Sequence, residues 1–423
     1  MSGYKFKVGS LFAGVGGICL GFKQAKHKDL GYELIWANEI DEYAAETYNL
    51  NFKHELIVGD IEKVIDPGIV DKEKEEYKQL LENVKSEKEK EKYKELIQKC
   101  EIEKPLYEEK KKQILTHKID VLNGGFPCQA FSIAGEQKGF EDHRGNLFWN
   151  IVNLIKLLDP IHGKPRILFL ENVKNLQSHD NGNTYKIIKN ELEKVGYVIK
   201  EAVLNTMYFS DLPQNRERIY IIGFLNKEDA NKFTMFDNLN NYYKAKNPNE
   251  RIETIKNILD LNLNKDNGAE YYYTKEKYPN YFLTEDEYMA IPKEKRKAIR
   301  INLDEQINEE YQFYQVRRGM YVRKNMSNVC PTLTANMGTG GHNVPLIKVT
   351  DGIRKLTPEE TFKLQGFPIE KGYKLPEKYN NRNYPKSQLY KQAGNAVSVP
   401  IIKLIAEELL KVLGREKQEN IMD

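Results

Sequence analysis

Residues 5–17 read KFKVGSLFAGVGG, and this stretch decides how the N-terminal part of the chain is interpreted. Phe6 to Phe12 has the apolar character of a short buried strand that runs directly into a glycine cluster. Glycines at a strand end let the backbone turn tightly and let a ligand approach it closely. No Gly-Lys-Ser/Thr follows, which excludes a P-loop, and Cys19 stands at the third glycine position of the dinucleotide pattern GxGxxG. The stretch therefore predicts a ligand-binding turn. The missing third glycine makes a bound pyrophosphate a weaker prediction.

Strand-like and helical patterns alternate beyond this turn. Such alternation predicts an α/β fold with a mostly parallel sheet covered by helices on both faces, in which ligands bind at the carboxyl ends of strands. Further strands are predicted at 32–38, 56–61, 119–124, 166–171 and 218–224, and helices at 41–50, 147–158 and 184–195.

Two segments interrupt the alternation. Residues 71–113 are dense in Lys and Glu with apolar residues at helical spacing, which predicts a protruding helical hairpin with Pro105 ending or bending one helix. We interpret it first as a solvated pair of charged helices, with a contact surface for DNA or a partner as the alternative.

From residue 226 onward Asn, Tyr and Lys dominate and the alternation is lost, which predicts a second, smaller and less regular domain. We therefore expect one domain over 1–225 plus 386–423, completed by a C-terminal helix at 401–413, and a second over 226–385.

Composition excludes several classes of protein. The 423-residue chain has 65 Lys and Arg against 62 Asp and Glu, so its net charge of +3 does not decide for or against nucleic acid. No apolar run approaches the roughly 18 residues of a membrane helix, and the first residues lack the layout of a signal peptide. The four cysteines form no CxxC pair and the histidines no HxxxH or HExxH group, so we expect no metal site, no disulfide framework and a cytoplasmic location.

Carboxylates follow two of the predicted strands. Glu39 stands at the end of the second strand, where a carboxylate can accept hydrogen bonds from both ribose hydroxyls. Asp60 follows the third strand and could accept from an adenine amino group. Behind the glycine cluster, these residues predict a site for a nucleoside without a diphosphate, for which S-adenosylmethionine is the obvious candidate.

Reactive side chains follow the next strands. Residues 124–132 read GGFPCQAFS and place Cys128 in a loop beyond a strand end, as expected of a nucleophile. Glu171 ends the fifth strand, and Arg216 and Arg218 enter a later one at the period of two that points side chains the same way. A thiol, a carboxylic acid and two cations beside a nucleoside site suit covalent activation of an electron-poor ring.

These motifs, in this order, resemble those of the bacterial DNA cytosine-5 methyltransferases. SLFAGVGG resembles the cofactor loop of that family, ANE and GDI its next cofactor motifs, and GGFPCQAFSIAG its catalytic loop. ENV, QNRERIYIIGF, RKLTPEETFKLQGFP and QAGNAVSVP then follow in family order and bring the resemblance to about two-thirds of the chain. It implies a Rossmann-like sheet of the class I adenosylmethionine-dependent methyltransferases, with 226–385 as target-recognition domain and hinge.

The resemblance also implies roles for the reactive residues. Cys128 would attack C6 of a flipped-out cytosine, and Glu171 would engage N3 and the exocyclic amine, which the backbone carbonyl of Pro127 would also contact. Arg216 and Arg218 would hold the flipped nucleotide. The positions that match cofactor contacts, with Pro127 beside them, are Phe12, Val15, Gly17, Glu39, Ile40, Asp60, Ile61, Asn395 and Val397.

DNA contacts are expected from the catalytic loop and from the second domain. Gln129 and Ser132 match loop positions near DNA, and the run QVRRGMYVRKN supplies Arg317, Arg318 and Arg323. Arginine can read guanine edges bidentately. The expected substrate is a short specific sequence in double-stranded DNA, and the expected molecule is a monomer that acts independently of any cognate restriction endonuclease.

Three alternatives remain open from the sequence. One is a cytosine-5 methyltransferase that acts on transfer RNA, because one branch of the family shares these motifs. Another is a catalytically silent DNA-binding regulator, which the joint presence of Cys128, Glu171 and Arg218 argues against. The least favoured is a dehydrogenase, given the broken dinucleotide pattern.

Overall fold

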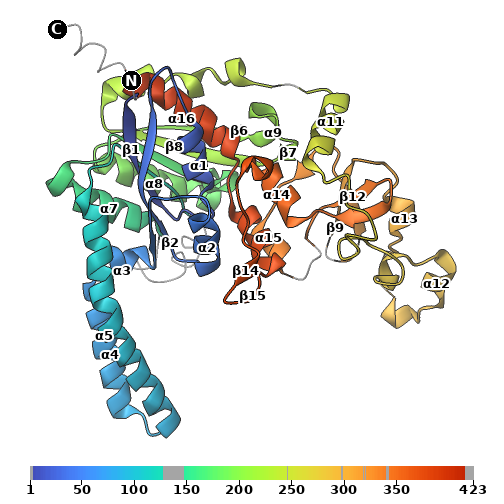
Figure 1. Cartoon of the computed structure of the whole chain (residues 1–423), viewed down its shortest axis with the longest axis horizontal. Helices are drawn as coiled ribbons and strands as arrows, with labels where there is room; N and C mark the ends of the chain where they lie inside the picture. The colour runs from blue at the N-terminus through green and yellow to red at the C-terminus, as the bar shows by residue number, and fades with distance from the viewer. Residues whose placement is uncertain are drawn as a thin grey trace.

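A seven-stranded sheet forms the centre of the molecule. The computed structural model describes residues 3–126, 147–244, 246–296, 299–317, 319, 321–339 and 343–414. The strands of this sheet are β1 Lys5–Leu11, β2 Gly31–Glu39, β3 Glu55–Val58, β4 Val121–Gly125, β5 Ile167–Val173, β6 Val198–Asn205 and β8 Glu217–Phe224. Their order is β3-β2-β1-β4-β5-β8-β6 (Figure 1). Neighbours from β3 to β5 are parallel, and β8 runs antiparallel to both β5 and β6. This confirms the predicted α/β fold.

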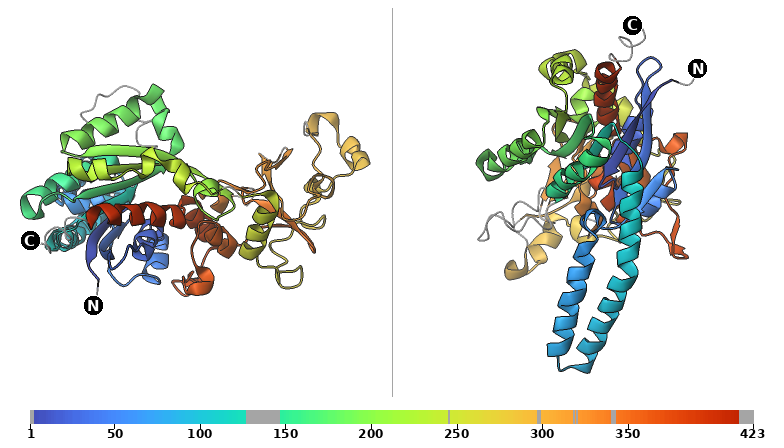
Figure 2. Two further views of the ribbon diagram at one scale, coloured as in Figure 1. Left: turned by 90° about the horizontal axis from the view of Figure 1, so that it is seen from above. Right: turned by 90° about the vertical axis from the view of Figure 1, so that its left-hand side faces the viewer.

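Helices cover both faces of this sheet (Figure 2). They are α1 Gly17–Gln24, α2 Glu42–Asn49, α3 Ile61–Ile65, α7 Leu147–His162, α8 Asn183–Lys194, α9 Thr206–Phe209, α10 Lys227–Lys232 and α16 Val399–Leu413. On one face α7 and α8 share a core with Leu122 and Leu168 of the sheet, and on the other α1 and α16 share a core with Val8. A Cβ added to Gly21 would lie 2.5 Å from Ile402 Cβ, so the glycine lets the C-terminal helix pack closely on α1.

The inserted segment is a helical hairpin, as predicted. It consists of α4 Gly68–Asn83 and α5 Glu87–Thr116, and it projects from the body of the molecule (Figure 1). Pro105 lies inside α5, which continues past it, so the proline does not end the helix. None of the helices in the described part of the chain is long and apolar enough to cross a membrane.

The second region is built on a smaller antiparallel sheet in the order β10-β9-β12-β13. A core that includes Phe313 and Ile347 of this sheet also includes Val15 and Tyr48 of the first domain, so the two regions pack on each other. Its strands and helices, with those that join it to the first domain, are β7 Gln214–Asn215, α11 Pro248–Ile258, α12 Glu285–Ala290, α13 Leu303–Gln306, β9 Phe313–Arg317, β10 Tyr321–Lys324, β11 Cys330–Pro331, β12 Leu346–Val349, β13 Gly352–Lys355, α14 Pro358–Leu364, β14 Lys378–Tyr379, β15 Arg382–Asn383 and α15 Lys386–Asn395.

The structure corrects three expectations about these elements. The third strand ends at Val58 and not at residue 61, because Gly59 adopts a φ of 145° and Asp60 caps α3. The strand β6 was not predicted, since Lys200 and Glu201 interrupt its apolar pattern. Residues 227–242 pack against the large sheet and α16, so by packing the second region begins after this segment and not at residue 226.

Candidate active site

A cavity of about 700 Å³ opens at the carboxyl ends of the central strands. The loop after β1, the ends of β2 to β5 and the turn between α15 and α16 all line it. Parallel strands end at one edge of a sheet, so side chains far apart in sequence meet there. The cavity therefore lies where the alternating pattern predicted a ligand.

The glycine loop forms one wall of this cavity. Phe12, Gly14 and Gly16 all have positive φ, at 53°, 55° and 82°. A positive φ on a bulky residue such as Phe12 costs on the order of 1–3 kcal/mol, and such strain concentrates at functional sites. A Cβ on Gly16 would lie 2.3 Å from the Phe52 ring, so this turn requires glycine.

Glu39 joins this loop to the end of β2. The carboxylate accepts hydrogen bonds from the backbone N–H of Gly14 at 2.7 Å, Ile40 at 2.9 Å and Asp41 at 2.8 Å. Burial raises the pKa of Glu39, and the three backbone hydrogen bonds oppose that rise. A rigid carboxylate is thus held at the cavity wall with lone pairs left for ribose hydroxyls.

Further predicted cofactor residues surround the same cavity. Asp60 caps α3 by accepting from the N–H of Glu62 at 2.9 Å, and Ile40 and Ile61 add apolar surface. The C-terminal turn comes back beside the glycine loop, where a Cβ on Gly17 would lie 2.8 Å from Val397 Cγ2. The structure brings nine of the ten predicted cofactor positions to this cavity: Phe12, Val15, Gly17, Glu39, Ile40, Asp60, Ile61, Asn395 and Val397.

Glu171 and Arg218 meet at the far end of the cavity. Glu171 lies inside β5, with 8% of its surface exposed. Its Oε1 lies 3.1 Å from the Nε of Arg218 on the neighbouring strand β8. The next residue, Asn172, donates to the backbone carbonyl of Phe126 at 2.8 Å. Phe126 is the last described residue before the segment that carries Cys128, so β5 also holds the entry to that segment.

Arg216 has a different environment from the one predicted. Its guanidinium is 2% exposed and donates to the carbonyls of Leu333 at 2.9 Å, Ala396 at 2.5 Å and Gly394 at 3.4 Å. Burial lowers its pKa to about 9, with repulsion from Arg218 as the next cause. Both terminal nitrogens of the guanidinium donate to protein carbonyls, while Nε has no hydrogen-bond partner among the described residues. We therefore reinterpret Arg216 as a residue that holds the cavity walls together.

Five predicted site residues lie outside the described residues. They are Pro127, Cys128, Gln129, Ser132 and Arg318.

Comparison with known proteins identifies the family of the chain. The sequence matches the family "C-5 cytosine-specific DNA methylase" over residues 6–74 and 71–411. The chain belongs to this family. It is 42% identical to the type II methyltransferase M.Bsp6I of Bacillus sp. (strain RFL6), over 96% of this chain and 98% of that protein. It is 32% identical to M.HaeII of Haemophilus aegyptius, over 97% and 94%.

The family gives this DNA methylase its activity and its cofactor. It transfers a methyl group to C5 of cytosine in DNA, and the methyl donor is S-adenosylmethionine. The cavity fits that donor, because a buried carboxylate, a strained glycine loop and apolar walls suit a nucleoside without a diphosphate.

Among solved structures the fold is similar to the Entamoeba histolytica methyltransferase EhMeth and the S. pombe Dnmt2 methyltransferase. Both have TM-scores of 0.54, cover 97% of this chain and 99% of their own, and are 18% and 16% identical.

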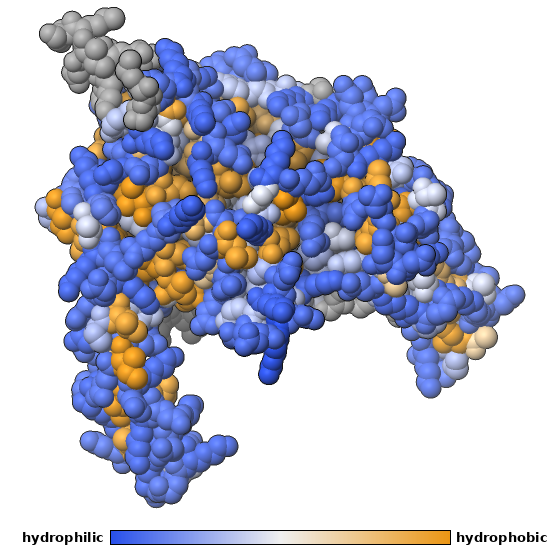
Figure 3. Space-filling view, viewed as in Figure 1, coloured by the Kyte–Doolittle hydropathy of each residue, from blue (hydrophilic) through white to orange (hydrophobic). Residues whose placement is uncertain are grey.

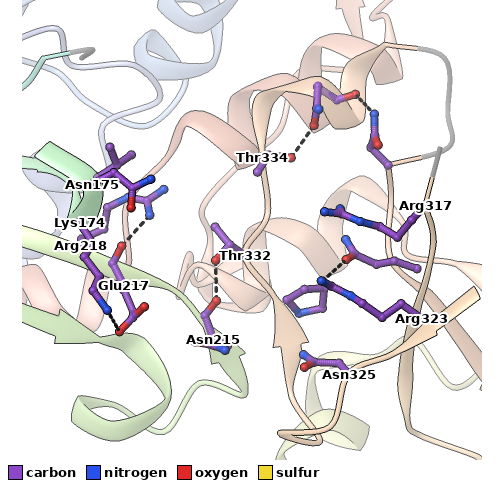
Figure 4. Close-up of a pocket in the computed structure, with 15 residues that line it drawn as sticks. Lys174, Asn175, Asn215, Glu217, Arg218, Arg317, Arg323, Asn325, Thr332 and Thr334 are labelled. Carbon is purple, nitrogen blue, oxygen red and sulfur yellow. Dashed lines mark hydrogen bonds and ion pairs between the residues drawn. The ribbon is translucent and has the colours of Figure 1, made fainter. Parts of the chain in front are cut away.

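A second cleft of the DNA methylase, of about 540 Å³, lies between the two regions. Figure 4 shows Lys174, Asn175 and Arg218 on one side of this cleft and Arg317 and Arg323 on the opposite side. Thr332 and Asn215 lie between these two groups, joined by a hydrogen bond of 2.6 Å from the threonine hydroxyl to the Asn215 carbonyl. Arg218 and Val173 line both this cleft and the cofactor cavity, so the two spaces meet at the Glu171–Arg218 pair.

Sequence reasoning missed several residues that shape these sites. Asn38 donates to the carbonyls of Ile57 and Gly59, both at 2.9 Å, and so fixes the end of β3. Gln315 accepts from Arg323 at 2.9 Å across the β9–β10 pair. Asn38 stands inside the quoted motif ANE, and Gln315 opens the quoted run QVRRGMYVRKN, so both segments carried a signal although neither residue was singled out.

Proposed function

We propose that this DNA methylase acts on a cytosine flipped out of a short specific sequence in double-stranded DNA, through a covalent bond between Cys128 and C6. The observation that carries the proposal is the position of Glu171 and Arg218 at the junction of the cofactor cavity and the cleft. Addition to C6 and methyl transfer to C5 both approach the faces of the ring, which stacking covers in the duplex, so the base must leave the helix at a cost of about a few kcal/mol.

The chain's own residues would carry each step. The Cys128 thiolate adds to C6, and protonated Glu171 donates to N3, so that the electron pair of the C5–C6 bond becomes available at C5. Bound S-adenosylmethionine supplies the methyl group that C5 takes. Loss of the C5 proton to a base then restores the double bond as the thiolate leaves C6 and N3 returns its proton. Arg218, held against Glu171, fixes that carboxyl and contacts the base.

Covalent trapping tests this mechanism. DNA containing 5-fluorocytosine lacks the C5 proton, so after addition and methyl transfer the thiolate should be unable to leave. We expect a denaturation-stable protein–DNA adduct that requires S-adenosylmethionine and is absent for Cys128→Ala. An adduct formed by Cys128→Ala, or none formed by an active native protein, would contradict the mechanism.

We propose further that the cleft-facing side of β9 and β10 reads the DNA target. Gln315 and Arg317 lie on the same side of β9, and Arg323 pairs directly with Gln315 across the strands. A two-stranded ribbon fits the major groove, and an arginine oriented by a glutamine can offer its free edge to guanine O6 and N7. Arg318, from the same ribbon sequence, and Gln129 and Ser132, from the catalytic loop, are proposed as additional DNA contacts.

The reading role is tested by substitution at Arg323. We expect Arg323→Ala to lower kcat/KM on the cognate site about 5- to 150-fold, since a bidentate base contact is worth about 1–3 kcal/mol. Methylation mapped by bisulfite sequencing should spread to sites altered at one position. Replacement of exposed Lys378, which lines neither space, should leave the site preference unchanged. An unchanged methylation map for Arg323→Ala would contradict the role.

The curated relatives are type II methyltransferases of bacteria, and on that basis we propose the same biological setting. The protein would act as a monomer on cytoplasmic DNA and would protect its sites from a cognate restriction endonuclease that works independently.

A further inference from the structure

The base of the α4–α5 hairpin touches the cofactor cavity from outside. Tyr107 of α5 is 8% exposed and belongs to the same core as Ile57 and Ile61, which flank the turn after β3. Burial raises the pKa of its hydroxyl, and a polar contact with the backbone of Asp60 opposes that rise. A Cβ built on Gly59 would lie 3.5 Å from the same hydroxyl oxygen. Asp60 and Ile61 both line the cofactor cavity, so the residues that Tyr107 packs against are themselves part of the cavity wall.

The turn at Gly59 and Asp60 is held from two sides. On the sheet side, Asn38 donates to the Gly59 carbonyl and the Gly59 N–H donates to the Glu39 carbonyl, both at 2.9 Å. On the hairpin side, a Cβ on Gly59 would lie 3.3 Å from Tyr107 Cε1 and 3.3 Å from Lys110 Nζ. The φ of 145° at Gly59 is a conformation that L side chains rarely adopt, so these contacts fix an unusual backbone shape.

The tyrosine is itself fixed in place. The Lys110 ammonium lies 4.9 Å from the centre of the Tyr107 ring, in the arrangement of a cation–π contact. An ion pair of 2.7 Å between Lys63 of α3 and Glu73 of α4 ties the other helix of the hairpin to the same turn. Both helices of the insertion thus brace the short helix that Asp60 caps.

We propose that Tyr107 is a positioning residue of the cofactor cavity, through which the inserted hairpin sets the affinity for S-adenosylmethionine. It does not touch the cofactor; it holds Gly59 and Asp60 where they can contact the nucleoside. The proposal rests on the assignment of this cavity to S-adenosylmethionine. It gives the base of the insertion a role in cofactor binding that its charged sequence did not suggest.

Calorimetric titration of the full-length protein with S-adenosylmethionine tests the proposal. Tyr107→Phe keeps the ring and removes only the hydroxyl that lies beside Gly59 and Asp60, so we expect the Kd and the KM for the cofactor to rise about two- to tenfold. The kcat and the KM for DNA should stay within twofold of wild type. Tyr107→Leu should raise the Kd further, because it also removes the ring against Gly59.

Tyr93→Phe is the matched control. Tyr93 lies on α5 toward the far end of the hairpin and stacks on Tyr77 at 6.4 Å, away from the cavity, so its variant should bind the cofactor as wild type does. If Tyr107→Phe binds S-adenosylmethionine as tightly as Tyr93→Phe, or if kcat and the KM for DNA change as much as the KM for the cofactor, the proposal is overturned. Failure of the wild-type protein to bind the cofactor would instead overturn the assignment of the cavity.

Discussion

At the scale of single residues, the Glu171–Arg218 pair is the part of the proposed mechanism that lies within the described residues. Its two side chains are 10% and 13% exposed, so water competes weakly for the interaction and the pair keeps a fixed geometry. Glu171→Gln preserves size but removes the acid that would protonate N3. We expect the single-turnover rate of methyl transfer to fall about 10²- to 10⁴-fold, as when a general acid is lost.

Single-turnover assays with labelled S-adenosylmethionine would measure this effect. The exposed Glu193 of α8 provides a control, since Glu193→Gln removes a carboxylate of the same kind far from the cavity. Cofactor affinity should be unchanged in both variants. A Glu171→Gln enzyme with a wild-type rate would show that N3 receives its proton from elsewhere.

His54 makes stability depend on pH. Its Nε2 lies 2.6 Å from the Tyr48 hydroxyl, and its pKa is lowered to about 4, first by burial and then by the Lys23 charge. The unfolded chain therefore takes up a proton near pH 6.5 that the folded protein takes up only near pH 4. The free energy of unfolding should fall as pH drops between these values, by about 2 kcal/mol after allowing for partial exposure.

Urea unfolding at pH 7 and pH 5 would measure this dependence. His54→Gln cannot be protonated, so the variant should lose less stability than wild type over the same interval. Equal losses in the two proteins would mean that carboxyl groups alone cause the acid sensitivity.

Many site residues could be predicted because they obey a local rule. Glu39, Asp60 and Glu171 each lie at or just beyond the carboxyl-terminal part of a strand, and the parallel sheet brings these strand ends together. The partners of Arg216 could not be predicted in this way, because the carbonyls that it contacts lie 117 to 180 residues away. Backbone carbonyls are common to every residue, so no sequence pattern marks the ones that a buried guanidinium will use.

At the scale of elements, the hairpin divides into a functional base and a separable far end. Residues 68–116 contain 13 Lys and 13 Asp or Glu, so the hairpin has no net charge with which to attract DNA. Figure 3 shows its far end as hydrophilic, with hydrophobic surface nearer the body of the molecule. The apolar spacing predicted both helices, but it gave no sign that Tyr107 would reach the turn after β3.

Replacing residues 76–97 by a short glycine-rich turn should leave the enzyme active. The deleted part has equal numbers of Lys and Glu, and the shortened hairpin keeps Tyr107, Lys110 and the Lys63–Glu73 pair. We expect cofactor affinity, DNA affinity and kcat all within about twofold of wild type. A gel-shift titration that shows weaker DNA binding would mean that the far end contacts DNA after all.

At the scale of the whole molecule, Arg216 joins three parts of the chain. It stands between β7 and β8 and reaches Leu333, which follows β11, and the turn between α15 and α16. Leu333 lies between Thr332 and Thr334, which line the cleft between the two regions, and Ala396 lies next to Val397 of the cofactor cavity. One buried side chain therefore connects the sheet with a wall of each ligand space.

Arg216→Lys tests this connection, because an ammonium on a flexible stem cannot reach carbonyls in two directions as the planar guanidinium does. Buried carbonyls would lose their donors, so the free energy of unfolding should fall by about 3 kcal/mol. The affinities for S-adenosylmethionine and for DNA should fall together, as measured by calorimetry on the folded variant.

Arg166→Lys is the matched control. Arg166 forms a bidentate pair with buried Asp229, at 2.7 and 2.9 Å, and it lies where β5 begins, far from both spaces. The Arg166→Lys protein should lose stability and keep its affinity for both ligands. If the Arg216→Lys protein also loses stability and keeps both affinities, Arg216 stabilises the fold without influencing either site.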